Sequence, residues 1–117
     1  MEANARALGV DLGETDILVL SHGHYDNTGG ISRVLKHARK VAIPCHPGVL
    51  KPRFSIRDGK AKPIQIPQDS KSAIDRLPPH QLHWISQPVM LSMRIGLTGP
   101  IPRETSRGDG CYLRPML

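Results

Sequence analysis

A polar loop between two apolar runs constrains the fold of this 117-residue chain more than any other feature. The runs DILVL (residues 16–20) and VAIP (residues 41–44) have the length of buried strands. Between them, ISRVLKHARK (residues 31–40) repeats its apolar residues at helical spacing. A strand, a loop, a helix and a strand predict a parallel pair, with the loop at the carboxyl end of the first strand. We therefore expect an α/β fold with a functional site in this loop.

The rest of the chain gives shorter signals of helices and strands. We expect helices at residues 2–8 and 70–77, a hairpin at 53–66, and strands at 82–86 and 89–95. Gly9 is a plausible cap for the first helix, and Asp58-Gly59 is a typical hairpin turn. Residues 107–117 lack periodicity and are expected to be a disordered tail, or the end of a reading frame that once continued.

The composition predicts a small soluble domain with a core of Leu, Ile and Val. The chain has one Phe, two Tyr and one Trp, and its 11 Pro and 11 Gly interrupt long elements. No apolar stretch approaches the length of about 18 residues that a membrane span needs, and the N-terminus lacks an apolar signal segment. These features predict a cytoplasmic protein without a membrane partner. Cys45 and Cys111 have no metal-binding or disulfide spacing and are expected to be free thiols.

The net charge of +6 is concentrated in the middle of the chain. This basic segment contains a single acid, Asp58, and nine basic residues: Arg33, Lys36, Arg39, Lys40, Lys51, Arg53, Arg57, Lys60 and Lys62. A solvated basic face is the favoured interpretation, and binding of an anionic small-molecule substrate is an alternative. Nucleic-acid binding ranks last, because Phe54 is the one aromatic residue among these charges.

The loop itself places His22, His24 and Asp26 at every second position. In an extended backbone such side chains point the same way, and Gly23 lets the chain bend without a Cβ clash. Imidazole nitrogens and a carboxylate are normal ligands for zinc and related ions. A single loop histidine more often caps a backbone group, but three convergent groups after a strand indicate a metal site.

Three stretches of the sequence resemble the metallo-beta-lactamase superfamily. SHGHYDNTGG (residues 21–30) is similar to its metal-binding signature, H-x-H-x-D-H, and looks most like the branch related to dihydropterin-ribofuranosylaminobenzene phosphate synthases. NARALGVDLGETDILVLSHGH (residues 4–24) and GLTGPIPRET (residues 96–105) resemble the lead-in and the G-x-I-P-R stretch of that branch. The resemblance spans residues 3–106 and implies an αββα sandwich, of which residues 1–106 would be a fragment from the middle of the domain.

The resemblance implies roles for the loop residues. His22 and His24 match the pair that binds the first of one or two metal ions, and Asp26 matches the carboxylate that binds the second or orients the attacking water. Asn27 stands where the family has a second-site histidine, and its amide is a weaker zinc ligand. This departure predicts a weaker second metal site, for which Asn27 is the candidate ligand. His46 matches an HP pair and is expected to be a pocket residue.

None of the other histidines is a convincing third ligand: His37, His80 and His83 are expected at the surface or in strand packing. Two hypotheses for the function remain. The first is a metal-dependent hydrolase of esters, thioesters or phosphoesters, with Asp26 as its catalytic residue and with the rest of its domain supplied by another chain; an oligomer is a separate possibility for its partners. The second is a truncated, non-catalytic remnant that binds metal weakly or not at all.

Overall fold

A computed structural model describes residues 1–100 and the short strand Cys111–Tyr112. Its α-helices are α1 (Glu2–Ala7), α2 (Tyr25–Thr28), α3 (Ile31–His37) and α4 (Gln68–Asp75). The 3₁₀ helices are η1 (Leu12–Glu14), η2 (Pro47–Leu50) and η3 (Pro79–Gln81). The strands are β1 (Ile43–Cys45), β2 (Phe54–Arg57), β3 (Lys60–Pro63), β4 (Leu82–Trp84), β5 (Val89–Met90), β6 (Gly96–Leu97) and β7 (Cys111–Tyr112). This mixture of helices and strands is the α/β fold that the sequence predicts.

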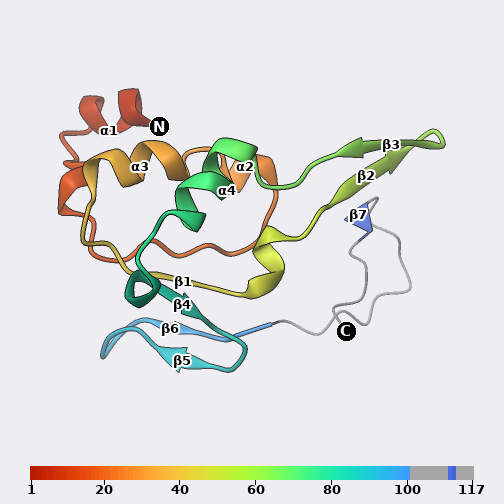
Figure 1. The fold of residues 1–117 in the computed structure, drawn as a ribbon. Helices are drawn as coiled ribbons and strands as arrows, with labels where there is room; N and C mark the ends of the chain where they lie inside the picture. Colours follow the sequence, from red (N-terminus) through yellow and green to blue (C-terminus); the bar gives the residue numbers. More distant parts are fainter. Residues whose placement is uncertain (101–110, 113–117) are drawn as a thin grey trace.

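Parallel strand segments form the centre of the molecule. The segment 16–20 runs parallel to the following chain through bridges between Ile17 and Ala42 and between Leu20 and Cys45. On the edge of β1 that faces away from the segment 16–20, β4 pairs with β1 in parallel, with Ile43 opposite Leu82 and Cys45 opposite Trp84. The predicted parallel pair is therefore confirmed. Figure 1 shows the helices gathered on one side of these segments and the β5–β6 hairpin on the other.

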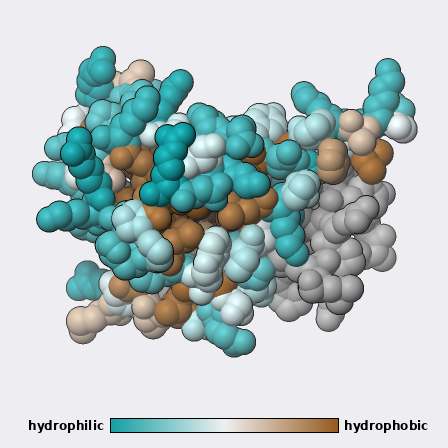
Figure 2. All heavy atoms as spheres, viewed as in Figure 1, coloured by the Kyte–Doolittle hydropathy of each residue, from teal (hydrophilic) through white to brown (hydrophobic). Residues whose placement is uncertain are grey.

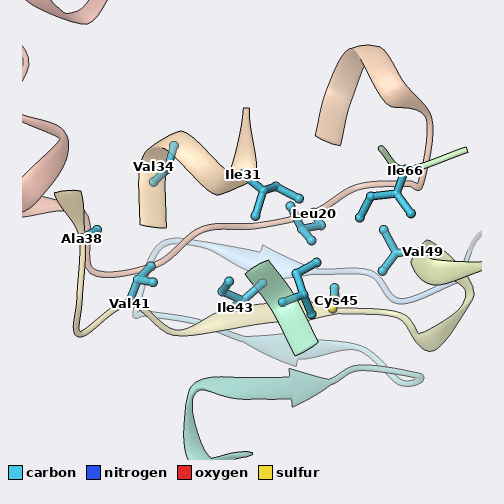
Figure 3. Close-up of a cluster of buried hydrophobic side chains, with 10 residues drawn as sticks. Leu20, Ile31, Val34, Ala38, Val41, Ile43, Cys45, Val49 and Ile66 are labelled. Atoms are coloured by element: carbon cyan, nitrogen blue, oxygen red, sulfur yellow. The ribbon is translucent and has the colours of Figure 1, made fainter. Parts of the chain in front are cut away.

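The hydrophobic core lies between α3 and the parallel segments. Ile31 points from α3 toward Leu20 (Figure 3), and Val34 and Ile43 belong to the same buried cluster. The remaining buried apolar residues are Ala38, Val41, Cys45, Val49, Ile66 and Ile74. The apolar residues at helical spacing on α3 and those of the strand segments thus form one small aliphatic core, as the composition predicts.

Two predictions of strands need correction. In the segment 16–20, which was expected to be buried, Ile17 and Val19 are 42% and 43% exposed, and Val19 lines a cavity together with residues 97–100. In the segment 89–95, the strand stops at Met90 and the chain turns back into β6. The Ser92 hydroxyl oxygen accepts hydrogen bonds from the backbone N–H groups of Arg94 and Ile95, and these bonds close the turn.

The turn predictions are confirmed. Asp58 and Gly59 have φ angles of 51° and 71°, as a two-residue hairpin turn of the I′ type requires, and Gly9 follows α1 with φ of 68°. The hairpin β2–β3 projects from one end of the molecule (Figure 1). Within residues 1–100 no helix has the length and apolar character that crossing a membrane requires. The predicted tail falls outside the described residues except at β7, which pairs with β2.

Candidate metal site

The predicted metal ligands converge at the end of the first parallel segment. One ligand atom each from His22, His24 and Asp26 lies within 4.8 Å of the other two. His24 has extended backbone angles, but Asp26 lies in the first turn of α2 and not in an extended strand. The convergence therefore comes from a strand-to-helix transition, where the helical turn brings the carboxylate back toward the imidazoles. In the described part of the chain, this is the one group of three or more histidines, cysteines and carboxylates that could hold a metal ion.

The donor set fits a divalent metal such as zinc. Ligand atoms that share a tetrahedral zinc lie roughly 3.3 Å apart, so these atoms need only small side-chain rotations to meet one ion. The rings of His22 and His24 lie edge to face, with centroids 4.7 Å apart and planes at 86°. His24 is half-buried, whereas His22 and Asp26 are exposed. Two of the three donors thus face solvent, from which an ion and a water molecule can enter.

The environment of His22 selects a tautomer suited to metal binding. The Asn27 side-chain amide donates to His22 Nε2 at 2.9 Å, so Nε2 carries a lone pair and the ring proton lies on Nδ1. The Ser21 hydroxyl oxygen lies 2.9 Å from that Nδ1 and accepts a hydrogen bond from its N–H. A neutral imidazole with its second nitrogen hydrogen-bonded is the usual form of a metal-bound histidine. Ser21 is a supporting residue that the sequence motif did not single out.

Asn27 lies inside the ligand group. Besides its bond to His22, the same amide nitrogen donates to Asp26 Oδ1 at 3.0 Å. The residue at the second-site position of the signature therefore bridges two of the three candidate ligands, His22 and Asp26. A metal ion at His22 Nε2 would displace this amide, and binding must compete with the two hydrogen bonds.

Gly23 allows the loop to lie directly against η2. A Cβ built on Gly23 would overlap the Val49 carbonyl oxygen and lie 3.0 Å from the carbonyl carbon. A glycine is thus required between the two histidines because the Val49 backbone lies too close for a side chain. The sequence suggested a different reason, that glycine lets the loop bend. This contact sets the position of the histidine pair relative to η2.

Three hydrogen bonds hold the other end of the loop. The Thr28 hydroxyl donates to the His24 carbonyl at 2.7 Å, and the Ser70 hydroxyl of α4 donates to the Thr28 carbonyl at 2.7 Å. The Tyr25 N–H donates to the Ile64 carbonyl at 3.0 Å. The short helix α2 is therefore anchored by contacts from α4 and from the chain after β3.

A cavity of about 360 Å³ opens beside His22. His46, Cys45 and Arg53 line it, together with apolar residues that include Val49 and Ile85. Burial raises the pKa of the Cys45 thiol to about 11, so the thiol stays protonated at neutral pH and is a poor metal ligand. The structure places His46 at the cavity and outside the ligand group.

The remaining histidines and basic residues lie mainly at the surface. His37 is exposed, and its Nε2 lies 3.1 Å from a Glu2 carboxylate oxygen; His80 and His83 are exposed too. In the basic segment every residue is exposed except Arg53, which is 8% exposed. The expected solvated basic face is thus present, with one guanidinium buried at the cavity. Figure 2 shows hydrophilic side chains over the α1–α3 side and at the end of the β2–β3 hairpin, with hydrophobic ones between.

The fold and the ligand group define a class of protein: the chain belongs to the metallo-beta-lactamase superfamily, whose family model matches residues 1–109. It is also similar to the 7,8-dihydropterin-6-methyl-4-(beta-D-ribofuranosyl)-aminobenzene-5'-phosphate synthase of Methanocaldococcus jannaschii, with 34% identity over 53 residues. The match covers 44% of this chain and 18% of the relative, so the chain spans less than a fifth of that protein. Both comparisons confirm the resemblance predicted from the loop.

Proposed function

We propose that this chain carries the metal-binding part of a metal-dependent hydrolase and that His22, His24 and Asp26 hold one divalent ion. The observation that carries the proposal is the convergence of these three ligand atoms to within 4.8 Å. Two imidazoles and one carboxylate suit zinc and leave a coordination position open. Membership of a superfamily that includes metal-dependent hydrolases supports the same function.

The chain's own groups divide the work of such a site. When bound, a divalent ion supplies Lewis-acid chemistry and makes water a better nucleophile near neutral pH. The exposed Asp26 carboxylate would orient a water molecule and accept a proton from it. The Asn27 amide donates to Oδ1 of this carboxylate and limits its rotation until a metal ion competes for the same oxygen. A small-molecule ester, thioester or phosphoester would lie in the cavity beside His22.

The second candidate is a non-catalytic remnant that binds one metal ion weakly. It is favoured by Asn27, whose amide occupies His22 Nε2 and Asp26 Oδ1 at the same time. An asparagine replaces an imidazole at this position, so a second ion would lack a strong ligand here. This arrangement supports at most one bound ion, and that ion competes with the Asn27 amide for His22 Nε2 and Asp26 Oδ1.

The exposed apolar side chains of Ile17 and Val19 support a further proposal, that another chain or a second copy covers the segment 16–20. The site would then be completed in an assembly.

A cytoplasmic location stays a prediction of the sequence.

Metal analysis tests the proposed site directly. The purified chain is loaded with zinc, desalted and analysed by mass spectrometry of the metal, beside His22→Ala, His24→Ala and Asp26→Asn. The parent should retain close to one zinc, and each variant should lose most of it. His80→Ala, an exposed histidine outside the group, is the matched control. Equal retention by all four variants would show that the ligands are assigned wrongly.

A further inference from the structure

The cavity beside His22 contains two basic side chains that the metal group does not use. Arg53 and His46 both line it, and Arg53 is the one buried member of the basic segment. None of the described residues that line the cavity is an Asp or a Glu. The described walls thus offer hydrogen-bond donors and positive charge next to a candidate metal ligand.

A single residue, Gly48 in η2, orients both basic side chains. Its N–H donates to His46 Nδ1 at 3.0 Å, and its carbonyl accepts from Arg53 Nη2 at 2.8 Å. The two contacts lie on one buried glycine, so the imidazole and the guanidinium hold fixed positions relative to each other. The neighbouring Val49 carbonyl touches Gly23, which ties this pair to the histidine loop.

The chemistry of the pair is that of an anion receptor. Because His46 Nδ1 accepts a hydrogen bond, the neutral ring carries its proton on Nε2 and offers a donor there. The Arg53 guanidinium is a planar fork that matches two oxygens of a phosphate or a carboxylate, and it stays charged at all relevant pH values. Both groups donate, and their hydrogen bonds to an anionic oxygen are of the strong, charge-assisted kind.

We propose that His46 and Arg53 form an anion subsite that holds a phosphate or carboxylate group of the substrate in the cavity beside His22. The assignment of the reacting end of the substrate to the metal group rests on the proposed function, whereas anion binding by the pair does not. The substrate would then be an anionic small molecule. Its scissile bond would lie close enough to the charged group for one cavity beside His22 to hold both.

Nuclear magnetic resonance on the full ¹⁵N-labelled chain tests the subsite, with inorganic phosphate and acetate as separate probes. The amide of Gly48 and the side-chain N–H of Arg53 should shift saturably with at least one probe. A stronger response to phosphate assigns a phosphate-bearing substrate, and a stronger response to acetate assigns a carboxylate. The titration is repeated on Asp26→Asn with a chelator present, where the metal group has failed but anion binding should be unchanged.

Two variants and a control make the result specific. His46→Asp keeps a side-chain acceptor for the Gly48 N–H but replaces the donor with a negative charge, and it should weaken binding at least tenfold. Arg53→Met should do the same, while Lys62→Ala on the exposed face of β3 should bind like the parent. If Arg53→Met fails to fold, His46→Asp alone decides. Equal binding by His46→Asp and the parent, or no saturable shift in the parent, would overturn the subsite.

Discussion

The hydroxyl of Ser70 in α4 donates a 2.7 Å hydrogen bond to the carbonyl oxygen of Thr28, the last residue of α2, across 42 positions of sequence. Both residues are fully buried, with no exposed surface. The Thr28 hydroxyl in turn donates to the His24 carbonyl. A helix far along the chain therefore holds the backbone of one candidate metal ligand in place.

Ser70→Ala should lower the free energy of unfolding by about 1–2 kcal/mol, because it removes the donor to a buried carbonyl. Zinc affinity should fall as well, since α2 loses an anchor. Urea unfolding and a zinc titration measure the two effects. Ser32→Ala is the matched control: its hydroxyl donates to Asp69 on α4 at 3.0 Å, but at the surface, where the loss should stay within about 0.5 kcal/mol.

Gly23→Ala should disturb the histidine loop more than its size suggests. The added methyl group would overlap the Val49 carbonyl, and a backbone cannot yield as a flexible side chain does. We expect a loss of about 1–3 kcal/mol in the free energy of unfolding, with weaker zinc binding. Gly59→Ala at the open hairpin turn, where no atom lies within 4 Å, separates the effects: it strains a positive φ but should leave zinc binding unchanged. Parental zinc affinity in Gly23→Ala would contradict the close approach.

Asn27→Ala and Asn27→His test the bridging amide. Asn27→Ala frees His22 Nε2 and Asp26 Oδ1 from a competing donor, so zinc should bind at least as tightly as in the parent. Asn27→His should raise the metal count above one only if the chain supplies further second-site ligands. The described residues contain no second group of metal ligands, so we expect the count to stay at one. A clear loss of zinc in Asn27→Ala would instead show that the amide supports the site.

The sequence predicted the elements whose signals are local. The helical spacing of α3, the Asp58-Gly59 turn and the alternating His22, His24 and Asp26 each follow from neighbouring residues, and the structure contains the elements and brings the three side chains together. The family was predictable as well, because its signature lies in one continuous loop.

The supporting contacts could not be predicted, because they join segments that are distant in sequence. Val49 against Gly23 and Ser70 against Thr28 depend on how η2 and α4 pack, and no spacing rule encodes that packing. The exposure of Ile17 had the same origin, since an apolar run does not show which of its faces is covered. The buried position of Arg53 was hidden among eight exposed basic residues.

The Cys45 thiol should be unreactive in the folded chain and should make stability fall at alkaline pH. The unfolded chain releases a thiol proton near pH 8.5, whereas burial keeps the folded thiol protonated up to about pH 11. The stabilisation is thus complete below the unfolded pKa and is lost as pH rises toward 11. Alkylation by iodoacetamide at pH 8 should be slow until urea is added. Cys111→Ser serves as the background in both measurements, and rapid alkylation of that folded variant would contradict the burial.

The chain alone should be marginally stable and show little hydrolase activity. Its core is small, and the exposed side chains of Ile17 and Val19 leave an apolar surface open to association. Zinc should raise the midpoint of thermal unfolding, because an ion that binds only the folded state at a hundred times its dissociation constant contributes about 2.7 kcal/mol. Circular dichroism on monodisperse protein with and without zinc measures this, beside assays on a generic phosphodiester and a generic thioester. A cooperative transition well above room temperature, with metal-dependent turnover that is lost in Asp26→Ala, would overturn the remnant candidate and show that the described site is sufficient for catalysis.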